Sequence, residues 1–308
     1  MKILITGCSG FIGRALVRTF SAPGVTIHGV CRNAEAHSSA LKGVTVFIGD
    51  CSNELFINQL FKDNMDYDVI FHCAARLPSD ANMVGDYLDD NILGVASICH
   101  NVLSLKKTVR FFYLSTCSVY ESHQEAVRNE SLATKPKTPY AVTKLAGEVI
   151  TGILQNQKNI QTFILRLAGV HGAPRSDGLF ANIIAKGFRG DTISVSDPTR
   201  MFHPLFIEEL VHVVKMLINM RFRPDFSVLN IASPLSLTLE TWIELVELIS
   251  TDTNNLSELA LANTSISPEF DISALQEKIG VLPPRIALDS LRNLKVFLKS
   301  EVNGASCV

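Results

Sequence analysis

Met1-Lys-Ile-Leu-Ile-Thr6-Gly7-Cys8-Ser9-Gly10-Phe11-Ile12-Gly13 opens the chain and decides the fold. A short apolar run leads into three glycines, and an amphipathic helical pattern follows them. Gly7 allows a tight turn, Gly10 lets the main chain approach a pyrophosphate, and Gly13 lets the helix pack closely on the strand. The free N–H groups at the start of that helix would then face the pyrophosphate. The stretch predicts a dinucleotide-binding turn, and the alternative is a purely structural strand-to-helix turn.

Outside this turn, apolar strands and helical patterns alternate through the first half of the chain. The strands are expected near residues 2–6, 25–31, 44–49, 68–74, 109–115 and 160–167. The helices are expected near residues 11–21, 53–62, 84–105, 140–157, 178–188 and 207–220. Such alternation predicts an α/β fold with a doubly wound, Rossmann-type parallel sheet covered on both faces.

The pattern changes after residue 167, where short apolar runs are separated by glycines and prolines. We therefore expect residues 1–167 to form the dinucleotide-binding domain and 168–308 to form mainly a smaller substrate-binding lobe. Residues 206–232 read as a helix followed by a strand, and they are expected to return to the first domain, so that the lobe is interleaved with the sheet. Trp242 lies on an amphipathic helical pattern and is expected in the core of the lobe.

Composition narrows the class of partner. Of 308 residues, 47% are hydrophobic and 19% are charged, and the formal net charge is −2. No basic patch recurs, so we expect no nucleic-acid partner. No apolar stretch is long enough for a membrane span, and the N-terminal apolar run is too short for a signal peptide. The seven cysteines form no C-x-x-C pair and the histidines show no metal-ligand spacing, which favours reduced thiols in the cytoplasm and no metal.

Tyr140 and Lys144 are the first candidates for chemistry. They lie four residues apart on a predicted helix and therefore share a face. A phenol titrates near pH ~10 in water, so it can act as a base near neutrality only if a cation stabilises the phenolate. An ammonium group one helical turn away would do so, and the alternative is an ordinary pair of surface neighbours.

Ser115 and Thr116 are the second group of candidates, because they end the apolar strand at 109–115. The carboxyl ends of parallel strands border the crevice where such sheets bind ligands. A serine-rich turn without a catalytic role is the alternative.

Taken in order, these pieces resemble the extended short-chain dehydrogenases/reductases, in the NAD-dependent epimerase/dehydratase group. The matching pieces are Thr6–Gly13, Gly49-Asp50, His72-Cys-Ala-Ala75, Asn91, Ser115–Tyr120, Tyr140–Lys144, Leu165–Gly172 and Phe206–Leu210. The resemblance implies that Tyr140 is the acid/base, that Lys144 holds the ribose and lowers the pKa of Tyr140, and that Thr116 binds the substrate oxygen.

The same resemblance implies a set of cofactor-binding residues. Asp50 would meet the adenine amine, Ala74 and Ala75 would line the adenosine side, and Asn91 would support the site. The full implied set is Gly7, Ser9, Gly10, Phe11, Ile12, Gly13, Arg32, Asp50, Cys51, Ala74, Ala75, Asn91, Tyr140 and Lys144. Without the resemblance, Asp50 would read as a turn residue and Asn91 as part of a polar helix face.

Two departures from the family pattern bear on specificity. Cys31 stands where NAD-binding relatives place an acid, and the adjacent Arg32 could pair with a 2′-phosphate, so NADP is expected with NAD as the alternative. A solvated arginine is the other reading of Arg32. Gly169 and the segment 202–204 replace residues typical of members that bind nucleotide sugars, and Gly169 instead resembles the 3β-hydroxysteroid dehydrogenase-like and reductase-like members.

We therefore expect an NAD(P)-dependent oxidoreductase that transfers a hydride between nicotinamide and a carbinol or carbonyl carbon. The alternatives are a sugar epimerase that retains its cofactor and a non-catalytic dinucleotide-binding scaffold. The partner would be a small carbonyl, alcohol or sugar, with Arg76, Leu77, Arg175 and Phe202 as candidate contacts or plain surface residues. Relatives often dimerise through the helices near 84–105 and 140–157, so a homodimer is expected.

Overall fold

The computed structural model describes residues 1–33, 39–79, 83–120, 127–173, 175, 179–189, 191–235, 237–250, 269–281, 286, 289–293 and 296–297. The chain divides into two compact units, each of which is described by itself. The first unit comprises Met1–Ser122, Ser131–Arg166 and Ile218–Leu229, and the second comprises His123–Glu130, Leu167–Leu217 and Asn230–Val308.

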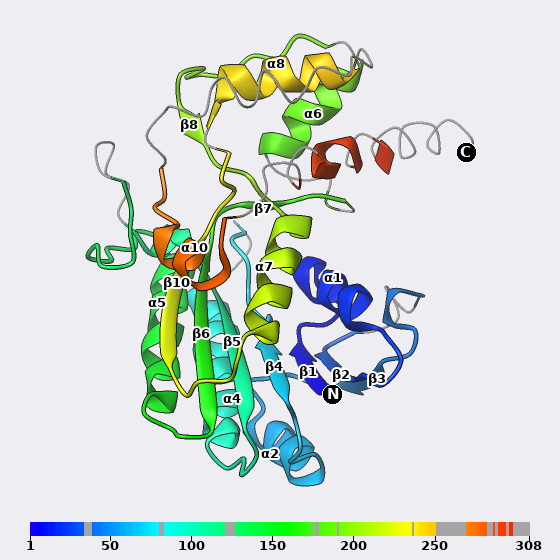
Figure 1. Ribbon diagram of the computed structural model, residues 1–308, viewed down its shortest axis with the longest axis vertical. Helices are drawn as coiled ribbons and strands as arrows, with labels where there is room; N and C mark the ends of the chain where they lie inside the picture. Colours follow the sequence, from blue (N-terminus) through cyan, green and yellow to red (C-terminus); the bar gives the residue numbers. More distant parts are fainter. Residues whose placement is uncertain are drawn as a thin grey trace. The chain divides into compact units, whose positions relative to one another are not determined.

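A seven-stranded sheet is the largest sheet in the described residues, and its order is β10-β6-β5-β4-β1-β2-β3 (Figure 1). Its strands are β1 (Lys2–Thr6), β2 (Thr26–Cys31), β3 (Thr45–Ile48), β4 (Val69–His72), β5 (Val109–Thr116), β6 (Ile160–Leu167) and β10 (Phe226–Ile231). The β1–β2, β2–β3, β1–β4 and β4–β5 pairs are all parallel. The predicted Rossmann-type α/β fold is confirmed. Strands β2 and β3 follow β1 on one side, whereas β4, β5 and β6 follow on its other side, and sheets of this kind bind ligands where the strand order reverses in this way.

One face of this sheet is covered by helices whose apolar side chains share a core with the strands. These elements are α2 (Glu54–Asp63), α4 (Gly94–Val102), α5 (Pro139–Thr151) and the 3₁₀ turn η4 (Gly152–Leu154). Ile57 of α2 and Ile98 of α4 are fully buried with Ile70 of β4 and Phe111 of β5. Burial on both faces explains why these strands read as continuous apolar runs rather than as alternating ones.

The opposite face carries a row of stacked aromatic rings. Phe20 of α1 (Phe11–Phe20) stacks on Phe71, with ring centroids 5.8 Å apart. Phe71 stacks on Phe112 at 4.9 Å, and Phe112 stacks on Phe163 at 5.0 Å. The row crosses β4, β5 and β6. It lies on the face opposite Ile70 and Phe111, because successive strand residues point to opposite faces.

The helix predicted at 84–105 is interrupted. The structure has α3 (Val84–Leu88), then a π-helical turn η2 (Asp89–Leu93), then α4. The extra residue in a π turn rotates the side chains that follow it, and such turns occur often at functional sites. Here the turn directs Asn91 inward, where it is only 2% exposed.

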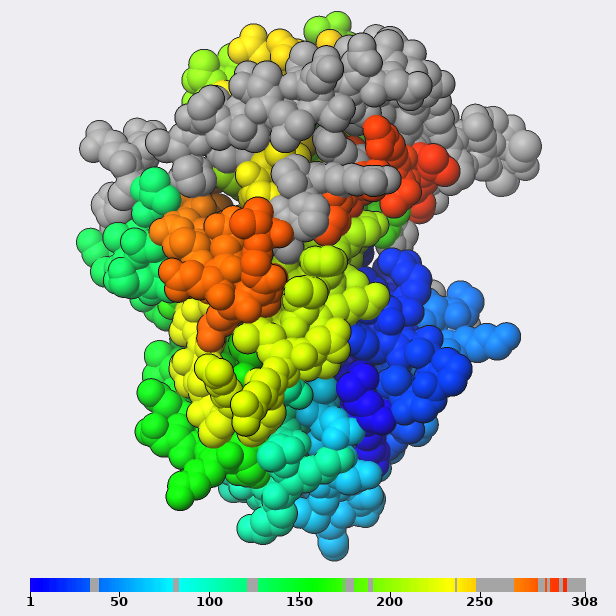
Figure 2. Space-filling model, in the orientation of Figure 1, coloured from blue at the N-terminus to red at the C-terminus, as the bar shows by residue number. Residues whose placement is uncertain are grey.

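The second unit has its own core, built from α6 (Leu179–Arg189), α8 (Leu239–Ser250) and neighbouring loops. Trp242 is fully buried in it, as expected, and its indole N–H donates to the Phe202 carbonyl at 2.9 Å. The remaining elements are β7 (Val170–His171), β8 (Met201–Phe202), β9 (Leu205–Phe206), α7 (Ile207–Asn219), β11 (Leu237–Thr238) and α10 (Ser273–Ile279). β7 pairs with β9, β8 pairs with β11, and α10 lies at the surface on the face shown in Figure 2.

Candidate active site

The glycine turn between β1 and α1 has the shape that a dinucleotide site needs. Gly7 has a φ of +65°, and a Cβ there would lie 2.8 Å from the Ala74 nitrogen. A Cβ on Gly13 would lie 2.2 Å from the Gly7 carbonyl oxygen, so only glycine lets α1 approach the turn. Gly10 caps α1 without a side-chain hydrogen bond. The first N–H groups of α1 therefore meet no capping side chain, which suits an anion.

Thr6 connects this turn to the end of β4. Its hydroxyl accepts a hydrogen bond from the Ala74 N–H at 3.2 Å and lies 2.9 Å from Nδ1 of His72. Burial lowers the pKa of His72 to about 3, so the ring is neutral and Nδ1 can accept the hydroxyl proton. The contact places the Ala74 and Ala75 segment beside the glycine turn, and the role of these two residues on the adenosine side stays a prediction.

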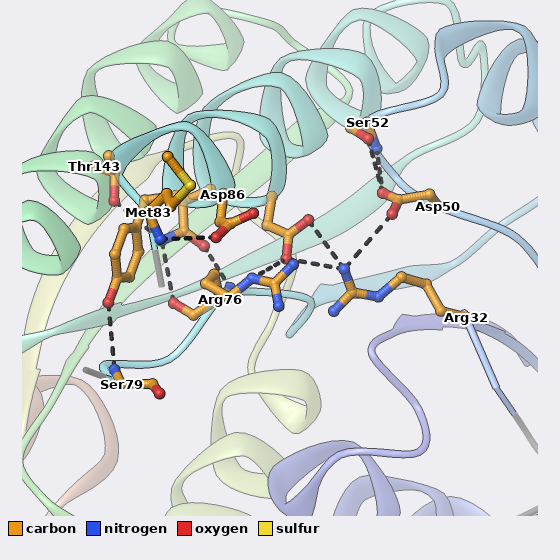
Figure 3. Close-up of polar contacts among 11 residues, drawn as sticks. Arg32, Asp50, Ser52, Arg76, Ser79, Met83, Asp86 and Thr143 are labelled. Atoms are coloured by element: carbon orange, nitrogen blue, oxygen red, sulfur yellow. Dashed lines mark hydrogen bonds and ion pairs between the residues drawn. The ribbon is translucent and has the colours of Figure 1, made fainter. Parts of the chain in front are cut away.

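Asp50 lies just after β3, on the opposite side of β1 from Ala74. One of its oxygens accepts from both the N–H and the hydroxyl of Ser52, each at 2.9 Å. Its other oxygen, Oδ2, lies 3.7 Å from Arg32 (Figure 3). The neighbouring Cys51 is 6% exposed, and burial raises the pKa of its thiol to about 12, so it remains protonated.

Arg32, at the end of β2, forms an ion pair that the sequence did not predict. Its Nη1 lies 3.2 and 3.1 Å from the two oxygens of Asp90, on the π turn. Oδ2 of the same carboxylate lies 2.9 Å from Nε of Arg76. Arg76, for which the sequence left open a substrate contact or a plain surface position, therefore contacts the residue that binds Arg32. No local pattern marks Asp90, because its partners lie far away in the sequence.

Asn91 connects the π turn to α5. Its side-chain oxygen accepts from the Arg76 N–H at 2.7 Å, and its Nδ2 lies 3.0 Å from the Thr143 hydroxyl. Thr143 precedes Lys144 on α5, so one amide side chain binds both the segment after β4 and the helix that carries the Tyr–Lys pair. This contact is compatible with the supporting role predicted for Asn91.

α5 places Tyr140 and Lys144 one turn apart. The Thr138 hydroxyl caps the helix by accepting from the Ala141 N–H at 3.2 Å, and Pro139 occupies the first turn. Tyr140 is half-buried, whereas Lys144 is 2% exposed. The predicted placement of both residues on one helix is therefore found.

Tyr113 of β5 lies beneath Lys144. The Lys144 ammonium lies 4.1 Å from the centroid of the Tyr113 ring, and the Tyr113 hydroxyl donates to the Lys144 carbonyl at 3.2 Å. A Cβ on Gly147 would lie 2.0 Å from that hydroxyl, which explains the glycine in the middle of α5. Burial lowers the pKa of Lys144 to about 7, and the carboxylate of Glu148 opposes this shift.

This buried lysine makes stability depend on pH. In the unfolded chain its pKa is about 10.4. Between pH 7 and 10 the unfolded state therefore holds a proton that the folded state has released, and stability rises with pH. We expect the free energy of unfolding of the wild type to rise relative to that of Lys144→Met by up to about 1.4 kcal/mol per pH unit. Urea unfolding at pH 7, 8 and 9 measures this difference, and a difference that does not change with pH contradicts it.

Thr116 ends β5 and begins the 3₁₀ turn η3 (Cys117–Val119). Its hydroxyl oxygen accepts from the Ser118 N–H at 3.1 Å and lies the same distance from the Ser118 hydroxyl. The contact holds the Thr116 side chain in one position at the carboxyl end of the strand. Cys117 is buried, and its thiol lies 3.1 Å from the Arg166 carbonyl oxygen.

A buried ion pair that the sequence analysis missed lies next to these residues. Arg166 of β6 binds both carboxylate oxygens of Glu148 on α5, at 2.7 Å from Nη2 and 3.0 Å from Nε. Ser115 donates to the same carboxylate at 2.5 Å, and Arg166 donates to the Tyr120 hydroxyl at 2.9 Å. Glu148 follows Lys144 by four residues, so its place on the buried face of the helix was the available signal.

Within the described part of the chain, no group of three or more His, Cys, Asp or Glu side chains is arranged to hold a metal ion. No helix among the described residues is both long enough and apolar enough to cross a membrane.

Several proteins of known name resemble part of this chain. This chain is 28% identical over 177 residues to a UDP-glucose 4-epimerase from Halalkalibacterium halodurans. The match covers 56% of this chain and 52% of that protein. This chain is also 25% identical over 219 residues to a 2-alkyl-3-oxoalkanoate reductase from Shewanella oneidensis. That match covers 68% of this chain and 54% of that protein. The chain thus spans about half the length of the curated relatives it matches.

Solved structures resemble the whole chain. The UDP-glucuronic acid 4-epimerase from Bacillus cereus, solved in complex with NAD, has a TM-score of 0.79 and 23% identity, covering 98% of this chain and 99% of that one. At this identity the likeness shows the fold. Residues 3–232 of the 308 also match the family described as the NAD dependent epimerase/dehydratase family. The protein belongs to the NAD dependent epimerase/dehydratase family, and the relatives named above are enzymes.

Proposed function

We propose that this protein is an NAD(P)-dependent oxidoreductase that transfers a hydride between a nicotinamide and a carbinol or carbonyl carbon. The observation that carries the proposal is the Tyr140–Lys144 pair on α5, with the lysine buried against Tyr113. α5 packs beside β5, whose end carries Thr116. The glycine turn supports a cofactor at this site, because side chains at Gly7 and Gly13 would collide with main chain.

Each residue has a separate task. Tyr140 exchanges the proton of the reacting oxygen, and the Thr116 hydroxyl orients that oxygen. Lys144 in its ammonium form, which predominates below pH about 7 in the folded protein, stabilises the phenolate of Tyr140. The nicotinamide cofactor, when bound, supplies or accepts the hydride. The glycine turn, the N-terminus of α1 and Asp50 would hold the cofactor, with Ser9, Phe11, Ile12, Cys51 and Asn91 beside them.

A sugar epimerase is the second candidate, because relatives of this chain include UDP-glucose 4-epimerases. Gly169 and the segment 202–204 instead favour a carbonyl or alcohol substrate without a nucleotide, and a reductase is also among the relatives. Thr116, Tyr140 and Lys144 are all present, which argues against a non-catalytic scaffold. Turnover with a panel of ketones, hydroxysteroids and UDP-sugars separates these functions. An oxidoreductase changes the absorbance of the nicotinamide in proportion to product, whereas an epimerase leaves it unchanged.

The proposal includes NADP(H) as the preferred cofactor, with Arg32 as the reason. Arg32→Ala should weaken NADP(H) more than NAD(H), because only NADP(H) carries the 2′-phosphate. A charge-assisted arginine–phosphate hydrogen bond contributes about 1.5–3 kcal/mol, which is roughly 10- to 150-fold in affinity. Titration of both reduced cofactors by fluorescence measures the effect. Tighter binding of NADH by the wild type contradicts the preference.

A homodimer is also part of the proposal. α3, η2, α5 and η4 are neighbours in the first unit and carry exposed apolar side chains. These are the side chains of Val84, Leu88, Leu93, Val142, Val149 and Ile153. Burying a valine fully contributes about 1.5 kcal/mol or more, so a surface of this composition favours pairing with a second copy.

Replacing two of these valines should separate the dimer. Val142→Lys with Val149→Lys places two charges in the proposed interface, and sedimentation velocity should then give a monomer. Leu55→Lys is the matched control, since Leu55 is 81% exposed on α2 and should leave the dimer intact. A wild-type monomer at micromolar concentration contradicts the proposal.

The remaining parts of the proposal concern organisation and location. Residues 168–308 are proposed to supply mainly the substrate-binding lobe, and 206–232 are proposed to belong in part to the dinucleotide-binding domain, since β10 joins its sheet. A cytoplasmic location is supported by the six described cysteines, which are free thiols. Cys307 lies outside the described residues.

A further inference from the structure

Asp90 occupies a particular place between two arginines. Its Oδ2 atom lies 3.1 Å from Nη1 of Arg32 and 2.9 Å from Nε of Arg76, the two arginines labelled in Figure 3. The Asp90 side chain is only 10% exposed, whereas those of Arg32 and Arg76 are 54% and 31% exposed. The carboxylate therefore stands where an outside anion would stand if two guanidinium groups were to bind it.

The charges of this group balance. Arg32 and Arg76 carry two positive charges, and Asp50 and Asp90 carry two negative ones. A 2′-phosphate brings a further charge of about −1.5 to −2. Arg32 can therefore bind such a phosphate only by leaving Asp90. The loss of the Asp90 contact offsets part of the binding free energy that the phosphate contact contributes.

Arg76 makes the exchange possible. When Arg32 turns to a phosphate, Asp90 keeps its contact with Arg76 and is not left as a mostly buried carboxylate without a counter-charge. A partly buried charge without a partner is costly, so the second arginine lowers the cost of releasing the first. Asp50, at 3.7 Å from Arg32 and 37% exposed, is a weaker competitor.

We infer that Asp90 determines how strongly this protein distinguishes NADP(H) from NAD(H), by competing with the 2′-phosphate for Arg32. Asp90 is a positioning residue, because it acts through Arg32. The inference rests on the proposed contact between Arg32 and the 2′-phosphate. Arg76 is the residue that accepts Asp90 when Arg32 is released.

The test compares the ratio of dissociation constants, NADH over NADPH, across a set of variants. Asp90→Asn should raise this ratio by about 1.4- to 5-fold, the range expected for loss of one competing ion pair at a partly exposed arginine. Arg76→Met should lower the ratio. Without Arg76, Arg32 is the remaining counter-charge of Asp90, so releasing Arg32 to a phosphate costs more. Asp89→Asn is the matched control, since it removes the same charge from an exposed neighbouring position and should leave the ratio unchanged.

Repeating Asp90→Asn in an Arg32→Ala background completes the experiment. There Asp90→Asn should no longer change the ratio. A merely structural role of Asp90, or a general effect of its charge, would instead still change the ratio in that background. If Arg32→Ala lowers the ratio but Asp90→Asn leaves it at the wild-type value, the inference is overturned while the cofactor proposal stands. If Arg32→Ala itself leaves the ratio unchanged, both are overturned.

Discussion

Tyr140→Phe should lower kcat by about 10²- to 10⁴-fold, the usual loss when a general acid or base is removed. The substitution removes the hydroxyl that would exchange the proton of the reacting oxygen, and the ring remains. Lys144 stays buried against Tyr113, so its surroundings change little. Cofactor affinity should therefore remain within a few-fold of the wild-type value.

Two measurements make this result specific. Steady-state turnover is compared with the dissociation constant of the cofactor, so that a loss of chemistry is separated from a loss of binding. Tyr67→Phe is the matched control, because Tyr67 precedes the amino-terminal end of the central strand β4, where its hydroxyl meets His28 at 2.9 Å. That variant should lose about 1 kcal/mol of stability and keep its turnover. Near-native kcat in Tyr140→Phe would exclude the proposed acid/base.

Arg166→Met should destabilise the fold by about 3–5 kcal/mol, the usual cost of leaving one partner of a buried ion pair without its counter-charge. Arg166 and Glu148 are 8% and 6% exposed, so neither can be solvated where it stands. Urea unfolding measures the loss. Glu148→Gln combined with Arg166→Met should recover part of it, because no unpaired charge is then buried.

An exposed ion pair is the control for this prediction. Lys107 lies 2.5 Å from Asp68, and the two side chains are 45% and 32% exposed. Lys107→Met should therefore cost only about 0–1 kcal/mol. Equal losses in Lys107→Met and Arg166→Met would show that burial does not govern the contribution of these pairs.

The fold was predictable because its signals are local. Gly7 and Gly13 mark the turn through backbone geometry that glycine alone supplies, and the alternation of apolar strands with helices marks the parallel sheet. The placement of Tyr140 and Lys144 on one helix follows from their spacing of four residues. The interruption of the helix at 84–105 was not predicted, because nothing in the spacing of its apolar residues marks the π turn at Asp89–Leu93.

The sequence by itself determined the glycine turn, the α/β class, the family and the helix that carries Tyr140 and Lys144. Only the tertiary structure showed that Asp90 lies between Arg32 and Arg76, that Tyr113 lies beneath Lys144, and that Arg166 binds Glu148. The physical reason is distance along the chain. A helical spacing or a glycine turn depends on neighbouring residues, whereas an ion pair between residues 58 positions apart, as for Arg32 and Asp90, depends on how strands pair and helices dock.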